Sequence, residues 1–140
     1  MNNAMAWLAR QTGCSLLAAR LVMGSILIAS GYNKFFVAGI DKVTGNFTGY
    51  GIPLPAVAAP FIGALELVGG VLLAIGLFTR YLGVLYFFEF IVAWYVKFAV
   101  IPAPIGGYAG ARLDSMIIVM AFLFATHGAG KYSVDAKRGM

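Results

Sequence analysis

Long apolar stretches, separated by short segments rich in polar residues, proline or glycine, dominate the hydrophobic pattern of this chain. Four stretches approach the roughly 20 residues that a helix needs to cross the hydrocarbon core of a bilayer. Their length and hydrophobicity predict four transmembrane helices at about 15–36, 56–77, 81–101 and 113–128.

The segments between these stretches are short, and one of them has a helical pattern of its own. In the first outer loop, apolar residues recur at spacings of three and four, which is typical of a short amphipathic helix on the bilayer surface or over the bundle. These residues are Ile40, Val43, Phe47 and Tyr50.

Only residues 78–80 link the second and third stretches, so these two helices are predicted to be antiparallel neighbours. The predicted fold is all-α, a polytopic four-helix membrane bundle in which residues 1–140 form one domain.

Composition agrees with a membrane protein and excludes several other classes. Hydrophobic residues make up 61% of the chain, charged residues 11%, and the mean hydropathy is +0.90, whereas soluble domains are about half apolar and a quarter charged. A single cysteine, Cys14, excludes an internal disulfide. The net charge of +5 comes from lysines and arginines scattered at the ends of the stretches, so we expect no nucleic-acid partner.

The distribution of lysine and arginine predicts the orientation of the chain. With four crossings both termini lie on one side, together with Arg10, Arg20, Arg80, Lys131, Lys137 and Arg138, and the other side carries Lys34, Lys42, Lys97 and Arg112. Because cytoplasmic segments carry the excess of these residues, we expect both termini in the cytoplasm.

Ionisable side chains within the apolar stretches are the candidate functional groups, because each costs several kcal/mol in a membrane unless it is paired or hydrated. Glu66 and Asp114 lie on helix faces made of small residues, which allow close helix contact and therefore point into the bundle. Glu89 and Lys97 share one face of the third helix. These four residues are predicted to form a buried polar pocket.

Glu66 and Glu89 are predicted to face a common cavity. They lie about ten and eight residues from opposite ends of antiparallel helices, and therefore at a similar depth. Two neighbouring carboxylates in an apolar medium do not ionise easily, so one is expected to hold a proton. Two interpretations stay open for both residues, a role in helix packing and a role in proton or ligand chemistry. For Lys34 and Lys97, an anchor that snorkels to the interface is the favoured interpretation.

Arg20 lies one turn inside the first predicted helix and needs a partner there. We predict that Asp135 lies close to it, with Arg80 as a further member of this structural ion-pair group, because the tail after the fourth helix returns to the same side. No predicted helix carries two histidine, cysteine or carboxylate ligands on one face, so no metal site is expected.

Three motifs in this order and spacing resemble the DoxX-like family of small four-helix membrane proteins. They are Arg20-Leu21 through Gly24, Gly31 and Lys34; Glu66-x-x-Gly69-Gly70 followed by residues 76–80; and Gly128-Ala129-Gly130 with Ser133 and Asp135. The family is named for its similarity to a membrane subunit of thiosulfate:quinone oxidoreductase. The resemblance therefore implies the four-helix fold and, more loosely, an association with oxidoreductases. Glu89 and Asp114 depart from the usual family pattern, which points to a pocket specialised differently from its relatives.

Two hypotheses of function follow. In the first, the chain is an integral membrane subunit of a quinone-linked electron-transfer system, whose polar pocket serves quinone binding or proton transfer, with electrons supplied by a redox protein partner. In the alternative, it is a non-catalytic accessory or scaffold subunit of a larger membrane complex, which its many small residues favour. Whether the chain is itself an enzyme stays open. We expect contact with the lipid bilayer, a location in the bacterial inner (cytoplasmic) membrane, and quinone rather than a metal as the cofactor.

Overall fold

The computed structural model describes residues 2–139 of the chain. Within this part, four helical segments are long and apolar enough to cross a membrane: Thr12–Val37, Pro55–Ile75, Thr79–Val100 and Gly107–His127. The prediction of an all-α polytopic membrane protein is therefore confirmed. The last segment begins at Gly107, earlier than the expected residue 113, because Gly107, Gly110 and Arg112 interrupt the apolar pattern at its start.

The elements follow one another without strands in the described part. They are α1 (Asn3–Ala9), α2 (Thr12–Tyr32), α3 (Ile40–Gly49), α4 (Pro55–Ile75), α5 (Thr79–Tyr95), α6 (Gly107–His127) and α7 (Val134–Lys137). Two short π-helical turns, Asn33–Val37 and Val96–Val100, extend α2 and α5. The amphipathic helix expected in the first loop is α3.

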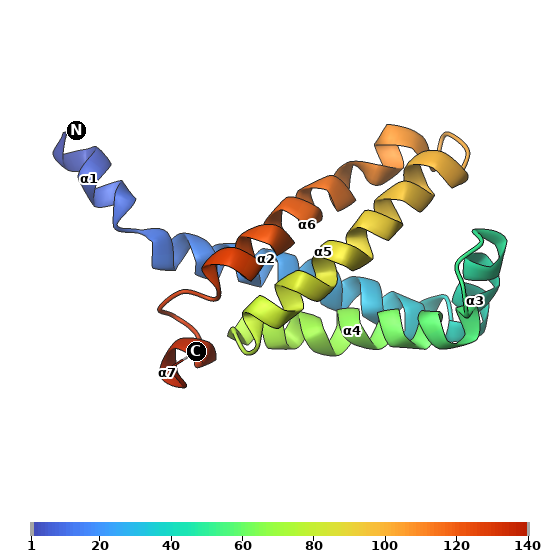
Figure 1. Cartoon of the computed structure of the whole chain (residues 1–140), viewed down its shortest axis with the longest axis horizontal. Helices are drawn as coiled ribbons and strands as arrows, with labels where there is room; N and C mark the ends of the chain where they lie inside the picture. The colour runs from blue at the N-terminus through green and yellow to red at the C-terminus, as the bar shows by residue number, and fades with distance from the viewer. Residues whose placement is uncertain (1, 140) are drawn as a thin grey trace.

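The long helices form two pairs rather than one evenly packed bundle. α2 packs along α4, and α5 packs along α6, whereas α4 and α5 contact each other much less. Figure 1 shows the two pairs diverging toward the end where α3 lies, with both termini at the opposite end. The second and third membrane helices, predicted to be neighbours, thus meet at their connecting turn and then separate, because each packs more tightly on another partner.

Glycines allow the helices within each pair to approach closely. A Cβ atom on Gly31 would lie 2.5 Å from the backbone nitrogen of Leu67, so α2 and α4 touch backbone to backbone there. In the second pair, a Cβ atom on Gly83 would lie 2.6 Å from the nitrogen of Ala125. Small residues are what permit such contacts between membrane helices. The contacts set the register of each pair and hence the depth of its polar side chains.

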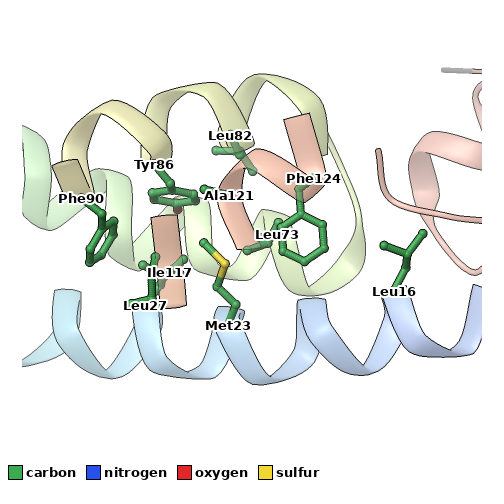
Figure 2. Packing of buried hydrophobic residues seen from close by; sticks show 10 residues of the cluster. All are labelled: Leu16, Met23, Leu27, Leu73, Leu82, Tyr86, Phe90, Ile117, Ala121 and Phe124. Carbon is green, nitrogen blue, oxygen red and sulfur yellow. The ribbon is translucent and has the colours of Figure 1, made fainter. Parts of the chain in front are cut away.

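The apolar core lies where the two pairs cross, and all four long helices contribute to it (Figure 2). Its buried residues are Leu16, Met23, Leu27, Leu73, Leu82, Tyr86, Phe90, Ile117, Ala121 and Phe124. The Tyr86 hydroxyl donates a hydrogen bond of 2.7 Å to the Leu65 carbonyl, which links α5 to α4. This contact holds the pairs together beneath the region where they diverge.

Arg20 joins α2 to the end of α4 and to the tail after α6. Its side chain is fully buried, and its guanidinium donates to the carbonyls of Ala74 at 2.9 Å and Tyr132 at 2.5 Å. The last carbonyls of a helix have no partner within the helix, so a guanidinium is well suited to them. Arg80 acts similarly on α6, whose Ala125 and Thr126 carbonyls accept from it.

Asp135 closes the same end by capping α5. Its two carboxylate oxygens accept from the N–H groups of Phe78 at 2.8 Å and Thr79 at 2.9 Å. Among residues 2–139, no salt bridge within 4.0 Å joins Arg20, Arg80 and Asp135. Arg20 and Asp135 do lie close together, as predicted, since both approach Gly76: the Asp135 N–H donates to its carbonyl at 2.9 Å, and a Cβ atom there would lie 2.5 Å from the Arg20 guanidinium. The direct ion pair is replaced by contacts to backbone groups, because unsatisfied helix ends compete for the same side chains.

Candidate functional site

A cavity of about 280 Å³ lies between the two helix pairs, on the side where they diverge. Residues from all four membrane segments and from α3 line it. Most of its walls are apolar, but five ionisable side chains reach them: Lys34, Glu66, Glu89, Lys97 and Asp114. The structure therefore places the four residues of the predicted pocket around one cavity and adds Lys34 to them.

Lys34 and Glu66 form an ion pair between α4 and the π-helical turn that extends α2. The distance from Lys34 Nζ to Glu66 Oε2 is 2.5 Å, and the same ammonium donates to Ser30 Oγ at 2.8 Å. The side chains are 20% and 4% exposed. Lys34 is thus engaged inside the protein and is not simply an anchor at the interface.

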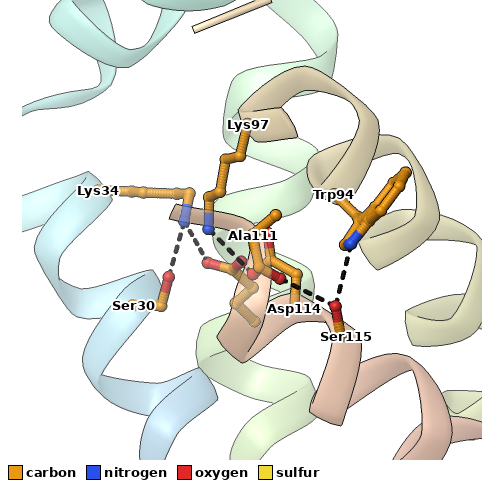
Figure 3. A network of polar contacts seen from close by, with 8 residues as sticks. Ser30, Lys34, Trp94, Lys97, Ala111, Asp114 and Ser115 are labelled. Carbon is orange, nitrogen blue, oxygen red and sulfur yellow. Dashed lines mark hydrogen bonds and ion pairs between the residues drawn. The ribbon is translucent and has the colours of Figure 1, made fainter. Parts of the chain in front are cut away.

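Lys97 and Asp114 form the equivalent pair across the second helix pair, with 2.9 Å between Nζ and Oδ1. The Asp114 side chain is 1% exposed and that of Lys97 39%, so the lysine reaches the carboxylate from the more open side. Beside it, Trp94 Nε1 donates to Ser115 Oγ at 3.0 Å (Figure 3). This contact fixes α5 against α6 at the depth of the ion pair.

The two ion pairs are built in the same way. Each lysine is the second residue of a π-helical turn that ends the first helix of its pair. Each carboxylate lies on the second helix of that pair, at Glu66 in α4 and Asp114 in α6. A π-helical turn is wider than an α-helical one and is frequent at functional sites.

Glu89 differs from the other two carboxylates because no cation within residues 2–139 pairs with it. Its Oε2 atom is buried without a hydrogen-bond donor from this part of the chain, and its carboxyl group neighbours that of Glu66 in the cavity. Asp114 Oδ2 is likewise buried and unpartnered. Buried acceptors without donors are costly. The cavity therefore has unused capacity to accept hydrogen bonds, either from a ligand or from a proton on a carboxyl group.

Sequence reasoning omitted Lys34 from the pocket. The available signal was the spacing of Ser30 and Lys34, which places a hydroxyl and an ammonium on one helix face.

His127, not expected at this site, lines a separate cavity of about 580 Å³ at the end with the termini, together with Arg80. Within the described residues, no group of three or more histidine, cysteine or carboxylate side chains is arranged to hold a metal ion.

Comparisons with known proteins give a family match and two distant relatives. The model of the DoxX family matches residues 15–99. The chain is 32% identical over 119 residues to "Putative oxidoreductase CatD" of Bacillus subtilis (strain 168), covering 85% of this chain and 83% of that protein. It is 30% identical over 135 residues to "Uncharacterized membrane protein Rv3486" of Mycobacterium tuberculosis (strain ATCC 25618 / H37Rv), covering 88% and 80%. No solved structure shows significant similarity to it.

Proposed function

The chain belongs to the DoxX family of membrane proteins, and we propose that it is the membrane subunit of a quinone-linked electron-transfer system. In this proposal, the central cavity binds the head group of the quinone and delivers protons to it. The observation that carries the proposal is the meeting of two lysine–carboxylate pairs and Glu89 around one cavity. The distant relative whose name describes an oxidoreductase agrees with it.

The two lysines suit a ligand with two acceptor oxygens. An ammonium has three N–H donors. Lys34 uses two of them, toward Ser30 and Glu66, and Lys97 uses one, toward Asp114. Each lysine thus keeps at least one N–H, and the two come from different helix pairs. A quinone ring has two carbonyl oxygens for these donors and an apolar face for the hydrophobic walls.

The neighbouring carboxyl groups suit proton delivery. Reduction of a quinone to a quinol takes up two electrons and two protons. Because Glu66 is paired with Lys34 and Glu89 is not, the proton shared by these neighbours belongs on Glu89, the residue without a cation. That proton satisfies the buried oxygen of Glu89 and is positioned for general acid catalysis. The electrons come from a redox protein partner in this proposal.

The size of the cavity limits what it holds. At about 280 Å³ it lies just below the roughly 300–1,000 Å³ typical of small-molecule sites. A single substituted ring fits this volume better than a dinucleotide cofactor.

We also propose that the protein resides in the bacterial inner membrane with both termini in the cytoplasm, so that α3 and the wider end of the bundle face outward.

Carboxyl labelling tests the proposal. The purified protein in lipid nanodiscs is treated with a hydrophobic carbodiimide, which reacts with protonated buried carboxyl groups, and labelled residues are mapped by mass spectrometry. We expect labelling of Glu89 and protection by a decyl-substituted 1,4-benzoquinone, with Glu89→Gln as the control for the assignment. Labelling that no quinone alters would favour the scaffold alternative. Co-purification of quinone or a redox subunit after gentle extraction is the complementary measurement.

A further inference from the structure

A second hollow, of about 310 Å³, lies between α2 and α6 and is lined only by apolar residues. Val22 on α2 and Met116 on α6 are among them and are 61% and 68% exposed. Because both helices belong to the membrane-spanning part, the hollow is a groove that opens sideways toward the acyl chains of the bilayer.

The groove adjoins the central cavity. Ile26, Leu113 and Ile117 line both of them, so these three apolar side chains form the wall between the two spaces. On one side of this wall lie five ionisable side chains, and on the other side there are none. A molecule that occupies both spaces must therefore have a polar head and an apolar extension.

Polar and aromatic contacts border other sides of the cavity. Between α4 and α5, Tyr86 donates its hydrogen bond to the Leu65 carbonyl. Toward the end with α3, Phe47 and Tyr50 form part of the cavity wall. In the described part of the chain, no hydrogen bond joins α2 to α6, and these helices touch little. Separation of α2 and α6 would thus break only apolar contacts, which lipid chains can replace.

We propose that the groove between α2 and α6 holds the hydrocarbon tail of a lipid-soluble quinone, whose ring lies in the central cavity. This inference rests on the proposed function and specifies its ligand: a membrane-dissolved, long-tailed quinone that reaches the cavity laterally from the bilayer. A water-soluble quinone has no long tail, so lipid acyl chains would occupy the groove instead.

Photolabelling locates the tail. A 1,4-benzoquinone with a diazirine near the end of a decyl chain is bound to the protein in nanodiscs, irradiated and mapped by mass spectrometry. We expect the label on α2 and α6 next to Val22, Met116 and Met120, and its loss with excess unlabelled decylbenzoquinone. Label confined to α3 or to the segment between α5 and α6, or label that does not compete, would overturn the lateral route.

A matched pair of substitutions tests the same point by affinity. Val22→Phe narrows the groove, whereas Val68→Phe adds the same bulk on the lipid-facing side of α4, at a valine that is 58% exposed and does not line the groove. If the quinone tail occupies the groove, the larger phenylalanine side chain at position 22 is expected to weaken binding of the decyl-substituted quinone about tenfold. The ring without a tail should bind Val22→Phe within about twofold of the unsubstituted protein, because its site is untouched.

The outcomes separate the two proposals. If both quinones protect Glu89 from carbodiimide while Val22→Phe leaves their affinities unchanged, the ring site stands and the tail groove is rejected. If neither quinone protects Glu89 and the tail label does not compete, the quinone function itself fails. A tail label on α2 and α6 that phospholipid displaces as well as quinone would show an ordinary lipid site.

Discussion

Lys34 and Glu66 meet at 2.5 Å across α2 and α4, with the carboxylate side chain only 4% exposed. The contact is made possible by Gly31, one turn earlier on α2, where the two backbones touch. An acid at this depth would otherwise be unpaired in an apolar surrounding. The pair therefore has two roles, holding α2 on α4 and placing an ammonium at the cavity.

Glu66→Leu should destabilise the protein more than Glu66→Gln. Leucine leaves the Lys34 ammonium without its carboxylate, and breaking a buried ion pair in this way costs about 3–5 kcal/mol. Glutamine keeps a hydrogen-bond acceptor for the lysine. Membrane abundance and thermal unfolding in detergent are the measurements. The double variant Lys34→Met/Glu66→Leu should recover much of the stability that Glu66→Leu loses. Equal abundance of all variants would show that the ion pair does not contribute to folding stability.

Glu89→Leu should be tolerated for folding, unlike Glu66→Leu, because no cation within the described residues depends on Glu89. Removing a buried polar group without a partner is often neutral or stabilising. Abundance at or above that of the unsubstituted protein is expected, together with loss of carbodiimide labelling at this position. Strong destabilisation would instead mean that Glu89 mainly fixes helix packing.

Gly31→Ala should weaken the contact between α2 and α4. The added methyl group would lie 2.5 Å from the nitrogen of Leu67, so the helices must move apart, and overpacking of this kind costs about 1–3 kcal/mol. Gly45→Ala in α3 is the matched control, since nothing lies within 4 Å of its added Cβ. That variant should be neutral or gain up to about 1 kcal/mol from helix propensity. Similar melting temperatures for both variants would contradict the close contact.

Asp135→Ala should loosen the end that carries the termini. It leaves the N–H groups of Phe78 and Thr79 without acceptors, and each unsatisfied buried group costs about 1–3 kcal/mol. Asp135→Asn retains one oxygen and should lose about half as much stability. Asp41→Ala, at an exposed position of α3, serves as the control and should change the melting temperature little.

The proposed orientation can be tested with Cys14, the single cysteine of the chain, which is exposed at the start of α2. A membrane-impermeant maleimide should label it in inverted inner-membrane vesicles but not in intact spheroplasts. A Cys14→Ser/Asn46→Cys variant places the thiol on an exposed position of α3 and should show the reverse. Labelling of Cys14 from outside would invert the topology.

Much of the architecture was predictable because it depends on the chemistry of continuous segments. Hydropathy and length alone indicate how many helices cross the membrane, and periodicity indicates the amphipathic α3. Small residues around Glu66 and Asp114 similarly show that these carboxylates point inward. The start of α6 was missed because its glycine-rich first turn resembles a loop in sequence. The role of Lys34 was missed because a lysine near a helix end has the same sequence pattern whether it anchors the helix at the interface or pairs with a buried acid.

The sequence by itself thus determined an all-α membrane protein of the DoxX family with acidic groups facing its interior, because burial of apolar stretches in lipid follows from composition and spacing. Only the tertiary structure decided which cation meets which acid: Lys34 with Glu66, Lys97 with Asp114, and Arg20 with backbone carbonyls instead of Asp135. These choices depend on how helices tilt and pair, and α4 packs on α2 while its neighbour in sequence, α5, packs on α6. Helix pairing is set by steric fit between distant segments, which the local pattern of either segment does not contain.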